Sequence, residues 1–162
     1  MYSILDKRDK SDLMIGYGFS ISMWDEDCLY VSDKSKVEFI KNHGVSILKE
    51  NDVYDKYLNA SNSEKLDIIN ALEVDEQRGF WAVFASVVTN ETGCLICYVS
   101  DANNDDAAII VPYGAPWSYN DKEKEVFATP ESTRAFFKPW FEKLGIEEPV
   151  LFNTISFDNT WE

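Results

Sequence analysis

Three short apolar segments in the middle of the sequence place the strongest constraint on the fold. Phe80–Val88, Cys94–Val99 and Ala107–Val111 are rich in β-branched and aromatic residues, and turn-forming stretches separate them. Each segment is apolar on both faces, which is typical of a strand that is covered on both sides. We therefore predict a three-stranded antiparallel meander over residues 80–111, buried at the centre of the domain.

Strands are also expected near both ends of the chain. Tyr17–Trp24 alternates large apolar residues with glycine and serine, which predicts a strand with one wet face at the edge or open side of an antiparallel sheet. After an acidic turn, the sequence CLYVS at 28–32 predicts a returning strand. Val150–Phe157 predicts the last strand of the sheet.

Capping residues predict helices before the apolar centre. Ser32 or Asp33 can cap a helix that ends at Gly44, and Tyr54, Tyr57 and Leu58 have helical spacing in a second helix. A third helix opens with a capping box formed by Ser61 and Glu64. Each of these helices is expected to lie at the surface with one buried stripe.

A fourth helix is predicted after the centre, with Thr129 as its cap, Pro130 at its first position and Gly145 after its end. Pro139 lies inside it, so we expect a kink or two shorter helices. The positions assigned to the core are Phe137, Trp140, Phe141 and Leu144.

The length of 162 residues suits a single domain with its own apolar core. The sequence therefore predicts one α+β domain over residues 1–162, with a central antiparallel sheet packed by about four helices. The first residues contain no apolar leader segment, and the longest apolar run is far short of the roughly 20 residues that span a bilayer. Three cysteines fit a reducing compartment, so we expect a cytoplasmic protein.

The charge balance is the unusual feature of the composition. The chain has 29 acidic and 15 basic residues, for a net charge of −14, and the acidic excess is concentrated in residues 51–112. Proteins that bind nucleic acids or anionic membranes need the opposite sign, because they neutralise phosphates. Both kinds of partner are therefore excluded from the prediction.

The stretch after the second apolar segment partly matches a calcium-binding loop. Asp101, Asn103 and Asp105 occupy the first, third and fifth positions of an EF-hand. Asp106 and Pro112 stand where the motif requires glycine and a bidentate glutamate, and the flanks are predicted strands. We therefore interpret the stretch as a polar connection between strands, and predict no metal site.

Other candidate catalytic groups lack the partners that their chemistry requires. Cys94 and Cys97 are three residues apart in a predicted strand, so their side chains are expected to face opposite sides as buried structural residues. His43 lies in a last helical turn, where histidine commonly interacts with the helix dipole. No glycine-rich phosphate loop is present. The sequence predicts no catalytic residue and no cofactor.

Two neighbouring segments are candidates for binding another protein. The first is acidic, and the second is an aromatic loop followed by charges, a composition found in interface hot spots. The same loop could instead fold back over the edge of the sheet. The candidate residues are Asp101, Asp105, Asp106, Tyr113, Trp117, Tyr119, Asp121 and Glu123.

In size, acidity, cytosolic character and lack of catalytic motifs, the chain resembles bacterial immunity proteins against polymorphic toxins, notably those of contact-dependent growth inhibition systems. These families share no common motif, so the acidic SDANNDDA at 100–107 and the aromatic PYGAPWSY at 112–119 are candidates from this sequence alone. The resemblance implies a non-catalytic cytoplasmic protein. It would bind a cognate toxin domain, often a basic nuclease, and block its active site or substrate surface.

Two other functions remain open at this point. The first is a small enzyme or ligand-binding domain with a pocket between sheet and helices. The second is an acidic inhibitor that mimics DNA. The partner could also pair with the edge of the sheet, for which Tyr17–Trp24 is the predicted strand.

Overall fold

The computed structural model describes residues 13–22, 31–100, 107–112, 119–146 and 153–158, in which the chain forms seven helices and six strands. The helices are α1 (Asp33–His43), α2 (Val45–Glu50), α3 (Tyr54–Asn59), α4 (Asn62–Ala71), α5 (Phe80–Thr92), α6 (Asp121–Val126) and α7 (Pro130–Lys143). The strands are β1 (Leu13–Ser22), β2 (Glu73–Val74), β3 (Gln77–Arg78), β4 (Ile96–Ser100), β5 (Ala107–Pro112) and β6 (Asn153–Asp158).

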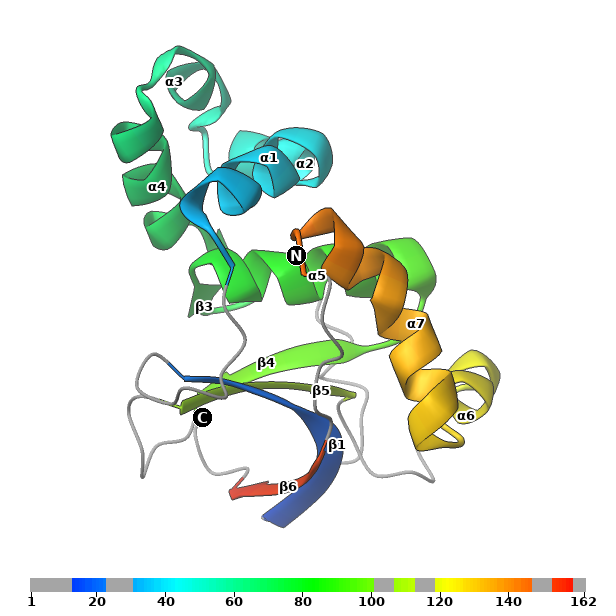
Figure 1. The fold of residues 1–162 in the computed structure, drawn as a ribbon. Helices are drawn as coiled ribbons and strands as arrows, with labels where there is room; N and C mark the ends of the chain where they lie inside the picture. The colour runs from blue at the N-terminus through cyan, green and yellow to red at the C-terminus, as the bar shows by residue number, and fades with distance from the viewer. Residues whose placement is uncertain (1–12, 23–30, 101–106, 113–118, 147–152, 159–162) are drawn as a thin grey trace.

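Four strands form an antiparallel sheet in the order β4, β5, β1, β6. Strands β2 and β3 form a separate hairpin that precedes α5. The larger sheet lies on one side of the molecule and the helices lie on the other, as Figure 1 shows. Strand β4 is the strand nearest to α5, and β6 is the farthest from the helices.

The predicted fold class, an α+β domain with a central sheet packed by about four helices, is wrong. Helices supply most of the regular structure in the described residues, and there are seven of them. The element at the centre of the core is α5, whereas the sheet covers one side of the helical layer (Figure 1). The meander predicted over residues 80–111 has only its last two strands, as β4 and β5.

The segment Phe80–Val88 is the first part of helix α5, and all of its residues except Trp81 and Ser86 are buried. A helix that is apolar all round carries no amphipathic stripe, so its periodicity resembles that of a strand covered on both faces. The glycines on either side set its length. Gly79, with φ 97°, precedes the helix, and Gly93, with φ 77°, ends it in the left-handed conformation that glycine adopts without strain.

Aromatic side chains join α5 to its neighbours. The ring of Phe84 lies 5.5 Å from Phe39 of α1 and 6.5 Å from Phe141 of α7, centroid to centroid. Phe19 of β1 lies 5.0 Å from Phe141 and 6.4 Å from Trp81 of α5, so it connects the sheet to the same core. Edge-to-face and stacked contacts of this kind add to the free energy gained from burial.

Most predicted helix ends are confirmed. The side chains of Ser32 and Ser61 cap α1 and α4 by accepting hydrogen bonds from backbone N–H groups three residues later. Gly44 follows α1 as predicted. Thr129 caps α7 through a box with Ser132, and the predicted core positions are buried: Phe137, Trp140, Phe141 and Leu144.

Helix α7 continues through Pro139, so of the two predicted outcomes, a kink or two shorter helices, the second is wrong. Proline removes the hydrogen bond to the carbonyl four residues earlier, which belongs to Ala135. Both Pro139 and Ala135 are exposed, so water can satisfy that carbonyl group. The helix is also held by the burial of its opposite face.

The predicted terminal strands are present with shifted bounds, as β1 and β6. The expectation that Tyr17–Trp24 forms an edge is wrong, because β1 pairs with β5 on one side and β6 on the other. The strand predicted at 28–32 falls mostly outside the described residues, and Val31 and Ser32 are not in a strand.

Candidate partner-binding surface

Three of the eight predicted binding residues lie in the described part of the chain: Tyr119, Asp121 and Glu123. The other five lie outside it: Asp101, Asp105, Asp106, Tyr113 and Trp117. The three described residues are at the start of α6, but they do not have the same role.

Glu123 is a structural residue in the interior, with an exposed fraction of 0%. One carboxylate oxygen accepts a hydrogen bond of 2.7 Å from the N–H of Leu95, and the other accepts one of 2.9 Å from the N–H of Asn120. The Asn120 side chain accepts from the N–H of Glu123 in return, which completes a capping box. A partner cannot reach this carboxylate, so Glu123 is not part of the binding surface.

Asp121 and Tyr119 lie closer to solvent. Asp121 is exposed in the first turn of α6. Tyr119 is half-buried, and its ring lies 6.2 Å from Phe127, which in turn lies 5.5 Å from Phe136 of α7. The last residue of the predicted aromatic loop is therefore attached to the helical core.

The start of α6 is fixed to the turn that follows α5. Asn120 donates a hydrogen bond of 3.1 Å to the carbonyl oxygen of Gly93, and the ammonium group of Lys122 donates to the carbonyl oxygen of Thr92. Together with the bond from Leu95 to Glu123, these contacts hold α6 against the connection between α5 and β4.

The register of the sheet brings the ends of three strands together. Ser22, the last residue of β1, pairs with Ala107, the first residue of β5. Ser100, the last residue of β4, pairs with Ala108. The sequence segments 23–30 and 101–106 are therefore attached to the same end of the sheet. Each carries three acidic residues and no lysine or arginine.

The β2–β3 hairpin presents acidic residues beside β4. Its two-residue turn consists of Asp75 and Glu76, both exposed and both with positive φ, at 51° and 69°. Gln77 donates a hydrogen bond to the carbonyl oxygen of Tyr98 in β4. The acidic tip of the hairpin therefore lies beside the strand that leads into Asp101.

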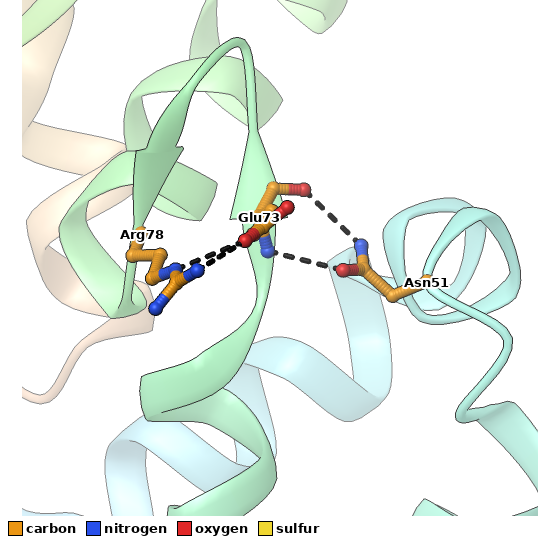
Figure 2. Close-up of polar contacts among 3 residues, drawn as sticks. All are labelled: Asn51, Glu73 and Arg78. Carbon is orange, nitrogen blue, oxygen red and sulfur yellow. Dashed lines mark hydrogen bonds and ion pairs between the residues drawn. The ribbon is translucent and has the colours of Figure 1, made fainter.

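Asn51 holds the hairpin in place through backbone contacts (Figure 2). Its side-chain oxygen accepts a 3.1 Å hydrogen bond from the N–H of Glu73, and its side-chain nitrogen donates one of 3.1 Å to the carbonyl oxygen of Glu73. The same nitrogen also donates a hydrogen bond of 2.9 Å to the carbonyl oxygen of Ile47. The end of α2 is thus joined to β2.

The carboxylate of Glu73 also forms an ion pair with Arg78 across the hairpin, at 2.6 Å (Figure 2). The two side chains are 59% and 71% exposed, so the pair contributes little stability. The prediction from sequence did not include this hairpin. Its Asp-Glu turn lacks the Asn-Gly or Asp-Gly pair that signals such hairpins.

Side chains from α5 and the hairpin cover the outer edge of β4. The hydroxyl of Thr89 donates to the carbonyl oxygen of Ile96 at 3.1 Å and accepts from its N–H at 3.0 Å. Gln77 binds the carbonyl of Tyr98, two residues along the same edge. A strand edge that is covered in this way is closed to a further strand.

The sequence predicts structural roles for Cys94, Cys97 and His43. The thiols of Cys94 and Cys97 are buried, as predicted. Burial, and secondarily the charge of Asp75, raises the pKa of Cys97 to about 12. His43 lies in the last turn of α1, with Nδ1 3.7 Å from a carboxylate oxygen of Glu91 and its ring 5.0 Å from Phe39. Cys28 lies outside the described residues.

Within the residues that the structure describes, no group of three or more histidine, cysteine, aspartate or glutamate side chains is arranged to hold a metal ion. No described helix combines the length and the apolar character that crossing a bilayer requires. Comparison of the chain with models of protein families, with curated proteins and with solved structures finds no match.

Proposed function

We propose that the protein is a non-catalytic immunity protein, which binds a cognate cationic toxin domain, such as a nuclease, and blocks its active site or substrate surface. The observation that carries this proposal is that Ser22, Ser100 and Ala107, from which two acidic segments of the sequence continue, lie at one end of the sheet. Segments 23–30 and 101–106 leave the same end of the sheet, and the Asp75–Glu76 turn lies beside β4, which leads to it.

The exposure of the acidic residues supports this function. In the ranges where burial is described, every aspartate and glutamate is exposed except Glu123. Carboxylates in water contribute little to stability, so their number is not explained by the core. A net charge of −14 produces a field that attracts a basic protein and speeds its encounter with this surface.

The binding test uses the product of the gene next to this one, purified as an inactivated variant. We expect it to bind the parent protein, with an association rate that falls as salt rises and a dissociation rate that changes less. Failure to bind this protein, together with failure to protect cells that express its active form, would show that the proposed function is wrong.

The location of the surface is tested by two variants with the same change of four charge units. Asp75→Lys with Glu76→Lys reverses the charge of the hairpin tip. Glu131→Lys with Glu142→Lys reverses the charge of two exposed residues on α7. We expect the first to slow association more than the second. A third variant, Asp105→Lys with Asp106→Lys, is expected to behave like the first. Equal rates for the hairpin and α7 variants would contradict this location.

A further inference from the structure

The two outer edges of the four-stranded sheet differ in what covers them. On the outer edge of β4, Thr89 binds the N–H and C=O groups of Ile96, and Gln77 binds the carbonyl oxygen of Tyr98. Strand β6 pairs with β1, and none of the other strands in the described ranges pairs with its opposite edge. Figure 1 shows β6 on the side of the sheet that is farthest from the helices.

The register of the sheet determines which backbone groups of β6 point outward. In an antiparallel ladder, the N–H and C=O groups of one residue point to the same side, and successive residues alternate. Both groups of Ile96 bind Thr89, so they point away from β5. The neighbouring residue Cys97 therefore faces β5, where it pairs with Val111.

The same alternation continues across β5 and β1. Val111 faces β4, so Ile110 faces β1, where it pairs with Phe19. Phe19 faces β5, so Gly18 faces β6, where it pairs with Asn153. The residues of β6 whose N–H and C=O groups point outward are then Thr154, Ser156 and Asp158.

The charges of β6 and of the whole chain indicate which kind of strand this edge accepts. Strand β6 contains one acidic residue, Asp158, and no lysine or arginine, and the whole chain has a net charge of −14. A second copy of the chain would carry the same net negative charge, and like charges repel. A strand with lysine or arginine side chains gains attraction at the same place.

We propose that the outer edge of β6 is the site where an extended, basic segment of the partner adds to the sheet as a fifth strand. Main-chain hydrogen bonds to Thr154, Ser156 and Asp158 would supply affinity, and charge would select the partner. This inference rests on the proposed function, to which it adds a second contact of the same partner, at the edge of the sheet opposite to β4 and the hairpin.

The decisive pair of variants is Ser156→Pro and Ser156→Ala. Proline removes the outward N–H group of residue 156 and no bond to β1, whereas alanine keeps that N–H group and removes only the hydroxyl. We expect Ser156→Pro to weaken binding of the neighbouring gene product at least tenfold, and Ser156→Ala to change it less than twofold. Thermal unfolding of both variants checks that the fold is kept.

A synthetic peptide tests the edge without the toxin. The probe alternates lysine with valine over about ten residues, which is long enough to span β6 at about 3.4 Å per residue. A peptide with glutamate in place of lysine is the control. We expect the lysine peptide to bind the parent and Ser156→Ala but not Ser156→Pro, and the glutamate peptide not to bind.

The possible results separate the two proposals. If the neighbouring gene product binds the parent and Ser156→Pro equally well, the inference about β6 is wrong and the proposed function stands. If that product does not bind the parent but the lysine peptide behaves as expected, the edge is a strand-binding site and the proposed function is wrong. Equal binding of the lysine peptide to both Ser156 variants shows attraction by charge alone, which overturns the inference.

Hydrogen exchange decides the matter if Ser156→Pro does not fold. In the parent protein, the lysine peptide should slow exchange of the outward amides of Thr154 and Ser156. The amide of Ile155, which faces β1, should change less because it is already bonded. Exchange rates at Thr154 and Ser156 that do not change on peptide binding would overturn the proposal.

Discussion

The two edges of the sheet show that an edge strand can be finished in different ways within one domain. At β4, a buried threonine binds both outward groups of Ile96 and a glutamine binds the carbonyl of Tyr98, as a neighbouring strand would do. Strand β6 lies on the side away from the helices, and none of the other described strands pairs with its outer edge. The difference separates an edge that is built into the core from one that is suited to a partner.

This difference follows from where the helices lie. Helix α5 runs next to β4, so its side chains can reach the backbone of that strand. No described helix lies beside β6 (Figure 1). An edge without such cover must rely on charge to prevent unwanted pairing, and the same charge favours a strand of opposite sign. Four predictions test how the covered side is built.

The largest expected effect is on the helix that covers β4. Phe84 is fully buried between α1 and α7, so Phe84→Ala should lower the free energy of unfolding by about 3–5 kcal/mol, as measured by urea denaturation. Leu58→Ala is the control, because Leu58 is 52% exposed, and it should change stability by less than about 0.5 kcal/mol. Similar losses in both variants would contradict the placement of α5 at the centre of the core.

The buried thiol of β4 predicts a loss of stability at alkaline pH. The pKa of Cys97 is raised from 9.0 to about 12, so the unfolded chain loses this proton at lower pH than the folded protein does. The neutral thiol therefore contributes on the order of a few kcal/mol to the free energy of unfolding below pH 9, and this contribution is lost as the pH rises to about 12.

The measurement is urea denaturation at several pH values between 8 and 12, for the parent and for Cys97→Ala. Tyr57, whose pKa burial also raises to about 12, contributes in the same direction to both proteins. The variant should therefore show a shallower dependence on pH but not a flat one. Identical slopes would mean that the thiol of Cys97 is not shielded from water in the folded state.

A smaller effect is expected from the hydroxyl that closes the edge. Thr89→Val keeps the shape of the side chain but leaves the N–H and C=O groups of Ile96 without their partner, which should cost about 1–3 kcal/mol. The amide of Ile96 should exchange its hydrogen faster. Thr89→Ser keeps the hydroxyl and should preserve the slow exchange, and equal exchange in both variants would contradict the role of Thr89.

The smallest effect is a gain in stability at the hairpin. Glu76 has a φ of 69°, which glycine adopts without strain. Glu76→Gly should therefore raise the free energy of unfolding by roughly 0.5–1 kcal/mol, which is measured as a small rise in the melting temperature. Glu76→Gln removes the charge but keeps the side chain in the strained conformation. Both variants should slow association with a basic partner, whereas only the glycine variant should be more stable.

Local signals in the sequence predicted the helix ends well, because a cap depends on a few neighbouring residues. Ser32, Ser61 and Thr129 each accept the hydrogen bond from the residue three positions later that their positions predicted. The core positions of α7 could be predicted because only one face of this helix is buried. Its apolar residues therefore recur at helical spacing in the sequence.

The centre of the molecule could not be predicted in the same way. Phe80–Val88 is apolar on all sides, so its sequence pattern does not distinguish a buried helix from a buried strand. The order of the strands depends on contacts between segments far apart in the chain, so β1 was wrongly placed at an edge. The burial of Glu123 has the same origin, because its partner Leu95 comes from another part of the sequence.

The anchor of the hairpin has a consequence for how this surface can evolve. Asn51 binds the main chain of Glu73 and not its carboxylate, so any residue except proline at position 73 can keep both hydrogen bonds. The side chains at 73, 75 and 76 can therefore be exchanged without losing the attachment that positions them. A lineage that meets a new partner could therefore replace the exposed side chains of the hairpin while Asn51, at the end of α2, still binds its backbone.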